Sequence, residues 1–377
     1  MTNYYEKATK FAEEHIKPVS GKIDSTKEFP AEIFDKLKDK GYLKLLIPEE
    51  LGGLGGDIYD HCEVIRAFSK ASATVGLTYM MHNVGLNLLL NGTEEQLKNK
   101  ILHEIKEEGK ILALAYSESG SGVNFYYPDK TRAEKEGDEW VINGAKSMVT
   151  SGTYASYYMV IAKTGEAKEE TDNFIVPLDA EGVSFKMEYW NGIGLQGNVS
   201  CPMSLENIRL PEAYRTGKPY SGMEQILTLV APPFIAGLAS VYSGLNEAIS
   251  EEAIMHATDR TFPDGSKLSE VDTIKRHISR IYNYANASVS ATQSAAMAAC
   301  NGDEDALPKI LSARVIASEN AIESGRLGML IGGGRAYSQF RNFSNYLADS
   351  LAGQVMAPSE DIIHQWIGSV LTGQDIP

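Results

Sequence analysis

The sequence predicts an α+β protein in which a helical N-terminal domain, a middle antiparallel β domain and a C-terminal four-helix bundle follow one another. Three observations support this order. Apolar residues recur with a helical period over 4–110, the composition then shifts to Val, Ile, Tyr, Trp and Thr with frequent turn residues, and the helical period returns after Pro211. We therefore place the domains at 1–110, 111–213 and 214–377.

The first domain shows starts and stops that are typical of helices. Pro30 stands in the first turn of a helix whose apolar face carries Ile33 and Leu37, and Gly41 provides its end. Thr93 is the expected N-cap of a later helix, because its hydroxyl can accept a hydrogen bond from a backbone N–H. Further helices are predicted over 57–71, 74–91 and 94–107.

The middle domain has the rhythm of short antiparallel strands. Its β-branched and aromatic residues are interrupted by turn signals at 136–138, 143–144, Gly165 and Gly182. These breaks predict a compact β domain that contains hairpins.

Long helices resume after the β domain. We expect Pro232 and Pro233 to kink or break the first of them, because proline has no backbone N–H to donate. The predicted helices cover 219–258, 268–301, 305–331, 337–352 and 359–371.

Composition and charge exclude several classes of function. The chain has 377 residues, 43% of them hydrophobic and 23% charged, so it can bury a large core. Its net charge of -15 opposes nonspecific binding to nucleic acid or anionic membranes. No apolar run reaches 18 residues, the N-terminus does not resemble a signal peptide, and CxxC and HExxH spacings are absent. We expect a cytoplasmic protein with no nucleic-acid, membrane or metal site.

Several segments resemble one known family. Residues 41–55 contain IPEELGGLG, residues 113–124 read ALAYSESGSGVN, and residues 137–152 read GDEWVINGAKSMVTSG. In order, these resemble the N-terminal signature, the TEPGAGSD loop and the GDxWVINGxKxWITNG strand pair of the acyl-CoA dehydrogenases. Later segments follow in the family's order at 172–177, 192–197 and 205–211. The resemblance covers nearly the whole chain and implies the family's three-domain fold.

The resemblance also implies that the chain binds FAD. Tyr116 and Ser117 lie in the loop whose hydroxyl residue touches the pyrimidine edge of the flavin, although Val123 replaces the usual serine there. Thr150 would bond the flavin ring, and Met148 occupies the position of a family tryptophan, where a thioether can still pack against an aromatic face. Without the resemblance, these segments are a Ser/Gly turn and an ordinary hairpin.

Two C-terminal segments resemble the family's site for the rest of the cofactor. Arg260, followed by Phe262, matches a helix end whose arginine reaches the flavin pyrophosphate, and a surface ion pair is the alternative for it. Gly332, Gly333 and Gly334 match the GGxGY turn of the adenine-diphosphate site, usually that of a neighbouring subunit, and a helix C-cap is the alternative. The resemblance implies a homo-oligomer, either a tetramer or a dimer.

The family's catalytic base is missing from its usual place. The resemblance puts Ala357 where acyl-CoA dehydrogenases carry the glutamate that removes a proton beside the thioester. Some members carry the base in the segment that corresponds to 225–236, which has no carboxylate here. Glu360 and Glu224 are the nearest substitutes, so the catalytic residue is unassigned. Ser359 is expected to keep the flavin contact of a family threonine.

The leading hypothesis is an FAD-dependent oxidoreductase that acts on the CH–CH group of an acyl thioester such as acyl-CoA. It would work in either direction by hydride transfer to or from flavin N5, with an electron-transferring flavoprotein as redox partner. Two alternatives are a flavin-dependent monooxygenase on the same fold and a flavin-binding homologue without catalysis. The sequence shows no basic cluster for a nucleotide phosphate, and it leaves the acyl group and the direction of electron flow open.

Overall fold

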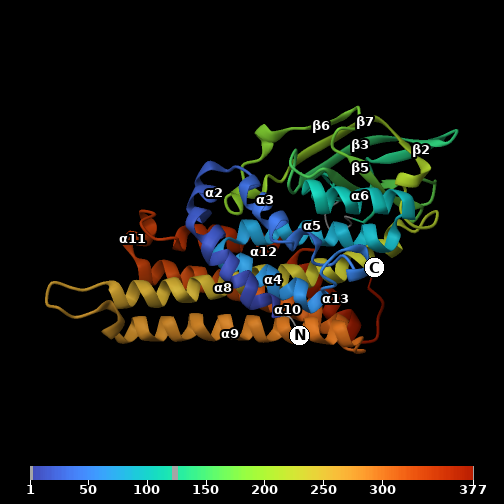
Figure 1. Ribbon diagram of the computed structural model, residues 1–377. Coiled ribbons are helices and arrows are strands. Elements are labelled where there is room, and N and C mark those ends of the chain that lie inside the picture. Colours follow the sequence, from blue (N-terminus) through green and yellow to red (C-terminus); the bar gives the residue numbers. More distant parts are fainter. Residues whose placement is uncertain (1–2, 121–125, 377) are drawn as a thin grey trace.

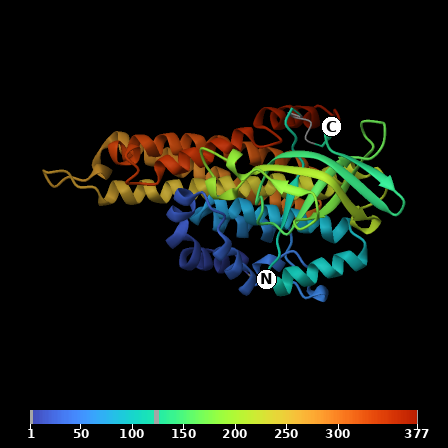
Figure 2. The ribbon, with the colours of Figure 1, turned by 90° about the horizontal axis from the view of Figure 1, so that it is seen from above.

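A computed structural model describes residues 3–120 and 126–376. It contains a β sheet, a group of N-terminal helices beneath it and a bundle of long C-terminal helices (Figure 1). The sheet lies over one end of the long helices, and their other end projects beyond the rest of the molecule (Figure 2). The chain passes from α6 (Glu95–Glu108) to β1 (Leu112–Ala115) and later from β7 (Cys201–Pro211) to α7 (Gly222–Gln225).

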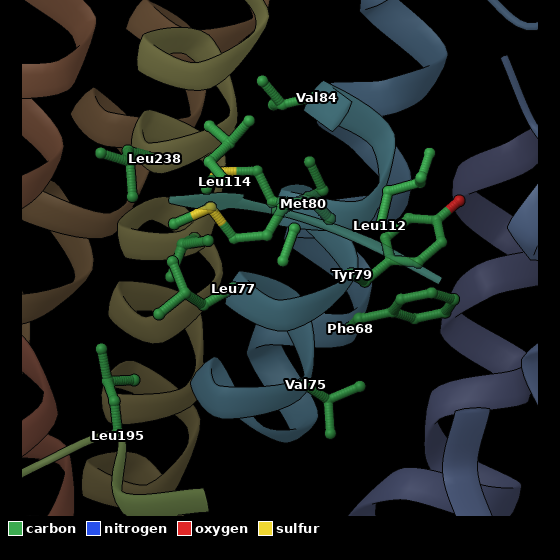
Figure 3. Close-up of a cluster of buried hydrophobic side chains, with 14 of the residues drawn as sticks. Phe68, Val75, Leu77, Tyr79, Met80, Val84, Leu112, Leu114, Leu195 and Leu238 are labelled. Atoms are coloured by element: carbon green, nitrogen blue, oxygen red, sulfur yellow. The ribbon is translucent and has the colours of Figure 1, made fainter. Parts of the chain in front are cut away.

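The N-terminal helices surround one central helix, α5 (Ala73–Gly92), which is buried along most of its length. Its side chains meet Phe68 of α4 (Ile58–Ala71), Leu112 and Leu114 of β1, and Leu238 of α8 (Ala231–Asp259) (Figure 3). Glu94, not Thr93, is the N-cap of α6. The remaining N-terminal helices are α1 (Tyr4–Phe11), α2 (Ser20–Thr26) and α3 (Ala31–Asp39).

The predicted end of α3 is confirmed. Gly41 follows the helix with φ 79°, a left-handed conformation that glycine adopts without a steric penalty from Cβ. The next helix, α4, begins with a capping box between Asp57 and Asp60, so both helix ends have the local chemistry that their sequences indicate.

The middle sheet has seven strands in the order β1-β4-β2-β3-β7-β6, with β5 paired to β4. Four pairs are antiparallel as predicted, but β1 and β2 each run parallel to β4. The periodicity of apolar residues indicates which residues are buried but not the direction of a neighbouring strand. It therefore cannot predict the two parallel pairs. The strands not yet given are β2 (Arg132–Glu136), β3 (Glu139–Val149), β4 (Tyr157–Lys163), β5 (Thr171–Pro177) and β6 (Val183–Phe185).

The predicted turn at 143–144 is wrong. Both residues lie inside β3, where the pairing with β7 shifts register between Ile142 and Gly144. Asn143 Oδ1 accepts a hydrogen bond from the backbone N–H of Asn207, 2.8 Å away, and a Cβ on Gly144 would lie 2.5 Å from Thr131 Cα. The Asn-Gly pair therefore makes a β-bulge that lets two backbones approach.

The C-terminal helices after α8 are close to those predicted. The expected helix 268–301 begins later, because a short 3₁₀ turn precedes it, and the expected helix 337–352 is replaced by a short helix and a longer one that starts at Phe343. The elements are α9 (Asp272–Asn301), α10 (Ala306–Gly332), α11 (Gly334–Tyr337), α12 (Phe343–Val355) and α13 (Glu360–Leu371).

The proline pair does not break its helix. A π-helical turn, Ile226–Val230, joins α7 to α8, and the two prolines lie in the first turn of α8. Because Pro233 has no N–H, the carbonyl of Leu229 loses its helical donor, and Asn87 Nδ2 supplies one from α5 at 2.7 Å. The helical run Gly222–Asp259 is long and apolar enough to cross a membrane, by length and composition only, and 67% of its most apolar window is buried inside the fold.

Candidate active site

The loop that follows β1 is fixed by a buried ion pair. Glu118 accepts a hydrogen bond from Lys146 Nζ at 2.8 Å and from the backbone N–H groups of Lys130 and Thr131 at 2.7 and 3.1 Å. The backbone N–H of Ser147 also donates to the carbonyl of Ser117 at 2.7 Å. These bonds tie the first half of the loop to β3, and its continuation, 121–125, lies outside the described residues.

The two partners stay charged at neutral pH. Burial opposes ionisation of Glu118, but Lys146 and the backbone amides outweigh it and hold the pKa of Glu118 below its usual range. Burial lowers the pKa of Lys146 to about 8, with Glu118 opposing the change. A charged pair inside the fold is stable only because nearly every oxygen and proton finds a partner.

The end of β3 presents Met148 and Thr150 to one space. A register shift between Lys146 and Val149 puts Met148 at φ 50°, and its side chain is 64% exposed. Thr150 is buried, and its Oγ1 lies 2.9 Å from the Oγ of Ser200. An apolar thioether and a pair of hydroxyls therefore line the same wall.

That wall belongs to a cavity of about 740 Å³ between the sheet and the C-terminal helices. The cavity brings together four positions that the sequence singled out, namely Ser117, Met148, Thr150 and Ala357. Ile193 and Leu195 also line it, and both belong to the family-like segment 192–197. Sequence patterns missed other lining residues because they lie in loops and helices without a motif of their own. These include Met81, Trp190, Asn198, Ser200 and Leu351.

A second, smaller cavity of about 80 Å³ adjoins the first. The two share Met81, Ser117, Met148, Phe234 and Ala357. The other lining residues of the small cavity are mostly apolar: Leu114, Tyr116, Ile226, Leu227, Val230, Ala231, Ile235, Pro358 and Trp366. Its described lining contains no carboxylate and no histidine.

Ala357 stands at the junction of the cavities, and the proposed substitutes for a base do not reach it. Glu360 receives a hydrogen bond from Ser318 Oγ of α10 at 3.2 Å, and Glu224 is exposed on α7. In the described part of the chain, Glu224, Glu360 and Ser359 line neither cavity. The junction therefore has a methyl group where a base would be expected.

Comparisons with known proteins identify the architecture. Residues 2–107, 113–208 and 236–371 match the N-terminal, middle and C-terminal domain models of the acyl-CoA dehydrogenases. The chain belongs to the acyl-CoA dehydrogenase family. The solved butyryl-CoA dehydrogenase of Megasphaera elsdenii has the same fold, with a TM-score of 0.91 over 99% of each chain at 21% identity.

Two curated relatives are reductases. A 3-(aryl)acrylate reductase of Clostridium sporogenes is 30% identical over 338 residues, which cover 88% of this chain and 87% of the relative. The caffeyl-CoA reductase-Etf complex subunit CarC of Acetobacterium woodii is 32% identical over 259 residues, 67% of each chain. The present family member is a flavin-dependent acyl-CoA oxidoreductase, and its cofactor is FAD.

The large cavity fits the flavin ring of this acyl-CoA dehydrogenase family member. Its volume lies in the range of ligand pockets, and its lining combines the hydroxyls of Ser117, Thr150 and Ser200 with the exposed side chain of Met148. Hydroxyls can bond the polar edge of the ring, while the thioether can pack on its face. Bound there, FAD would supply the two-electron redox chemistry.

The other predicted cofactor residues lie elsewhere in this family member. Arg260, Phe262 and the glycines Gly332 to Gly334 line neither described cavity, and the α8–α9 connection and α11 lie toward the projecting end of the bundle (Figure 1). The guanidinium of Arg260 lies 5.4 Å from the Phe262 ring centre. Within one chain, these residues and the flavin cavity form two separate regions.

A basic group that the sequence did not show occupies the projecting end. Arg260, Arg335 and Arg341 come from three segments and all act electrostatically on buried His256. Burial first, and then these arginines, lower the pKa of His256. Arg341 also pairs with Glu252 at 3.4 Å and Asp259 at 4.0 Å. Arg260 and Arg335 are the members with no ion pair in the described part of the chain, and a guanidinium of this kind suits a phosphate.

One group of possible metal ligands lies outside both cavities. Ligand atoms of Glu319, Glu360 and His364 lie within 4.8 Å of one another, on α10 and α13. Glu319 and His364 are exposed, and solvated carboxylates of this kind are common without an ion. The group contributes no residue to either cavity.

Proposed function

We propose that this protein is an FAD-dependent reductase of short α,β-unsaturated acyl thioesters. The observation that carries the proposal is Ala357 at the junction of the two cavities, with no carboxylate or histidine among the described residues of the small one. Oxidation of a saturated thioester needs a base to remove the α proton. Reduction needs a proton donor instead, and an uncharged group can serve.

The residues of the junction would hold the thioester in place. The backbone N–H of Ala357 is retained whatever its side chain, and it would polarise the thioester carbonyl in the way that oxyanion donors do. When FAD is bound in the large cavity, it would exchange a hydride with the β carbon of the substrate. Ser117 and Met148, which border both cavities, would keep the ring and the acyl group in contact.

The volume of the small cavity favours a short acyl group. At about 80 Å³ it is roughly half the size of an engineered 150 Å³ apolar cavity that binds benzene. The lining by Ile226, Val230 and Trp366 offers apolar contact and little hydrogen bonding to a chain inserted there. A four-carbon enoyl group is therefore preferred to an aryl-substituted one.

An electron-transferring flavoprotein is the proposed electron donor. The relative CarC is named as a subunit of a complex with such a protein, and the other reductase acts on an acrylate by its name. Both names agree with electron flow toward an unsaturated substrate. A coenzyme A thioester is the substrate form that the family membership supports.

We also propose that the protein acts as a homo-oligomer, either a dimer or a tetramer. The cluster of Arg260, Arg335 and Arg341 lines neither described cavity of its own chain, and it would meet the pyrophosphate of the cofactor in a neighbouring subunit. Replacing Arg335 by Gln should weaken FAD retention without changing the absorbance maxima of the flavin that remains. Sedimentation of the wild-type protein should show no stable monomer.

The function is tested with the bound flavin reduced under anaerobic conditions. Crotonyl-CoA should restore the oxidised flavin spectrum within seconds, whereas cinnamoyl-CoA should act slowly or not at all. Return of the spectrum with oxygen alone would favour a monooxygenase. If neither a thioester nor oxygen reoxidises the bound flavin, the proposal is contradicted and a non-catalytic homologue is favoured.

A further inference from the structure

Phe234 borders both cavities of the candidate active site. It follows the two prolines near the start of α8 and is half-buried, so part of the residue remains accessible. It lines the large cavity and the small cavity alike. A side chain that belongs to both linings stands at the boundary between the two spaces.

The other residues on this boundary are smaller or more flexible than Phe234. They are Met81, Ser117, Met148 and Ala357. A methionine side chain has three rotatable bonds and adapts to its neighbours, whereas serine and alanine are small. Phe234 is the only aromatic residue that the two described linings share, so it supplies the rigid bulk of the boundary.

The backbone at Phe234 is held against α4 and α5. The carbonyl of Pro233 accepts a hydrogen bond from His61 Nε2 of α4 at 3.1 Å. At Gly237, about one turn further along α8, an added Cβ would lie 2.6 Å from Met80 Cγ of α5, so the two helices pack in direct contact. The ring of Phe234 therefore moves by rotation of its own side chain and not by displacement of the helix.

We propose that Phe234 determines substrate specificity by restricting the protein to short enoyl groups. The inference rests on the proposed reductase function, in which the flavin and the acyl group occupy the two cavities. The reacting β carbon then has to lie at the boundary between them. A substituent on this carbon meets the ring of Phe234, which packs against the methyl group of a crotonyl thioester and clashes with the phenyl group of a cinnamoyl thioester.

The dimensions of the small cavity agree with this role. Its volume of about 80 Å³ leaves no room for an additional aromatic ring, and its outer walls cannot yield easily because Ile226, Val230 and Trp366 are buried in a packed core. Replacing Phe234 by Ala would vacate the space of one benzene ring at the boundary. A cinnamoyl thioester carries the same ring in place of the crotonyl methyl group.

Phe234→Ala and the milder Phe234→Leu test the proposal in the anaerobically reduced protein. The rate of flavin reoxidation is measured with cinnamoyl-CoA and with crotonyl-CoA, and the ratio of the first rate to the second is compared. In Phe234→Ala the ratio should rise by roughly 10–200-fold, and Phe234→Leu should give an intermediate value. The ratio of flavin to protein absorbance shows whether each variant keeps its cofactor.

Equilibrium binding provides a second readout that does not depend on turnover. The described lining of the small cavity contains no carboxylate, so saturated thioesters should bind to the oxidised protein without reacting. In titration calorimetry, Phe234→Ala should bind 3-phenylpropanoyl-CoA roughly 10–200-fold more tightly than the wild type does. Its affinity for butyryl-CoA should not increase, because the smaller group already fits.

Leu227→Ala is the matched control. Leu227 is also half-buried and lines the small cavity, but it does not line the large one. The change removes apolar bulk away from the boundary, so the preference for crotonyl-CoA over cinnamoyl-CoA should remain.

Three results would overturn the inference and leave the reductase function standing. If the wild type reacts equally fast with both thioesters, the ring imposes no restriction. If the Phe234 variants keep both their flavin and the wild-type ratio, another residue sets the limit. If Leu227→Ala gives the same gain, the total volume of the small cavity decides. A wild-type flavin that reacts with no enoyl thioester contradicts the reductase function itself, and the inference fails with it.

Discussion

Glu118 and Lys146 form an ion pair of 2.8 Å in which the side chains are 1% and 0% exposed. Replacing Lys146 by Met would leave a carboxylate buried without its counter-charge. We expect the free energy of unfolding to fall by about 3–5 kcal/mol, and FAD to be lost, since the pair supports the loop of Tyr116 and Ser117. Urea unfolding and the ratio of flavin to protein absorbance measure the two effects.

Lys135 provides the control for that change. It pairs with Glu212 at 2.9 Å, but the two side chains are 51% and 41% exposed. Lys135→Met should therefore cost less than about 1 kcal/mol and leave the flavin bound. Equal losses in the two variants would contradict the role assigned to the buried pair.

Ala357→Glu should add the missing base. A carboxylate at the cavity junction would remove α protons from a saturated thioester, so exchange of those protons with D₂O should rise by about 10²–10⁴-fold. Proton NMR of butyryl-CoA incubated with the oxidised protein measures the exchange. Ala357→Gln has nearly the same shape and no basic oxygen, and an equal gain in that variant would exclude base catalysis as the cause.

His61 and His82 make stability depend on pH. Burial lowers the pKa of each to about 4, against backbone carbonyls that oppose the change. In both rings Nε2 donates to a carbonyl oxygen, of Pro233 and Leu43 respectively, and Nδ1 accepts from an N–H, so no site is left for a second proton.

The sign of the effect follows from the unfolded chain, which binds these protons near pH 6.5. Stability is therefore complete above about pH 6.5 and falls as the pH drops toward about 4, by about 1.4 kcal/mol per pH unit for each histidine. Urea midpoints between about pH 7 and pH 5 test this. His82→Gln should remove about half of the slope, whereas the exposed His103→Gln should leave it unchanged.

Gly144→Ala should destabilise the sheet by about 2–4 kcal/mol. The new Cβ would lie 2.5 Å from the Thr131 backbone, inside a strand with φ 155°. At Gly137, in the β2–β3 turn with φ 63°, an added Cβ would meet nothing within 4 Å, and the change to Ala should cost only about 1–2 kcal/mol. Thermal unfolding compares the two, and equal losses would contradict the close approach at the bulge.

Helix positions could be predicted where the residues that end a helix are local in sequence. Gly41, which follows α3 with a left-handed φ, is an example. The β-bulge at Gly144 could not, because Asn-Gly is also the sequence of a tight turn and only the partner strand distinguishes the two. The continuous helix at Pro233 depends on Asn87, which lies 142 residues before the carbonyl that it satisfies and is unrelated to it by any local pattern.

The candidate site could likewise be predicted from the sequence only in part. Motifs identified Ser117, Met148 and Thr150, which the large cavity brings together, because each motif is a short run of sequence. The group of Arg260, Arg335 and Arg341 forms only in three dimensions. Local patterns indicated which residues were unusual, and packing decided what they face.

The large cavity takes its walls from all three parts of the chain, with Met81 from the first, Ser117 and Thr150 from the second and Ala357 from the third. The affinity for a cofactor in this cavity therefore depends on how well the three parts pack against one another. In a damaged or heated sample, cofactor release should precede the loss of helical circular dichroism, and excess FAD should act as a pharmacological chaperone for variants far from the cavity.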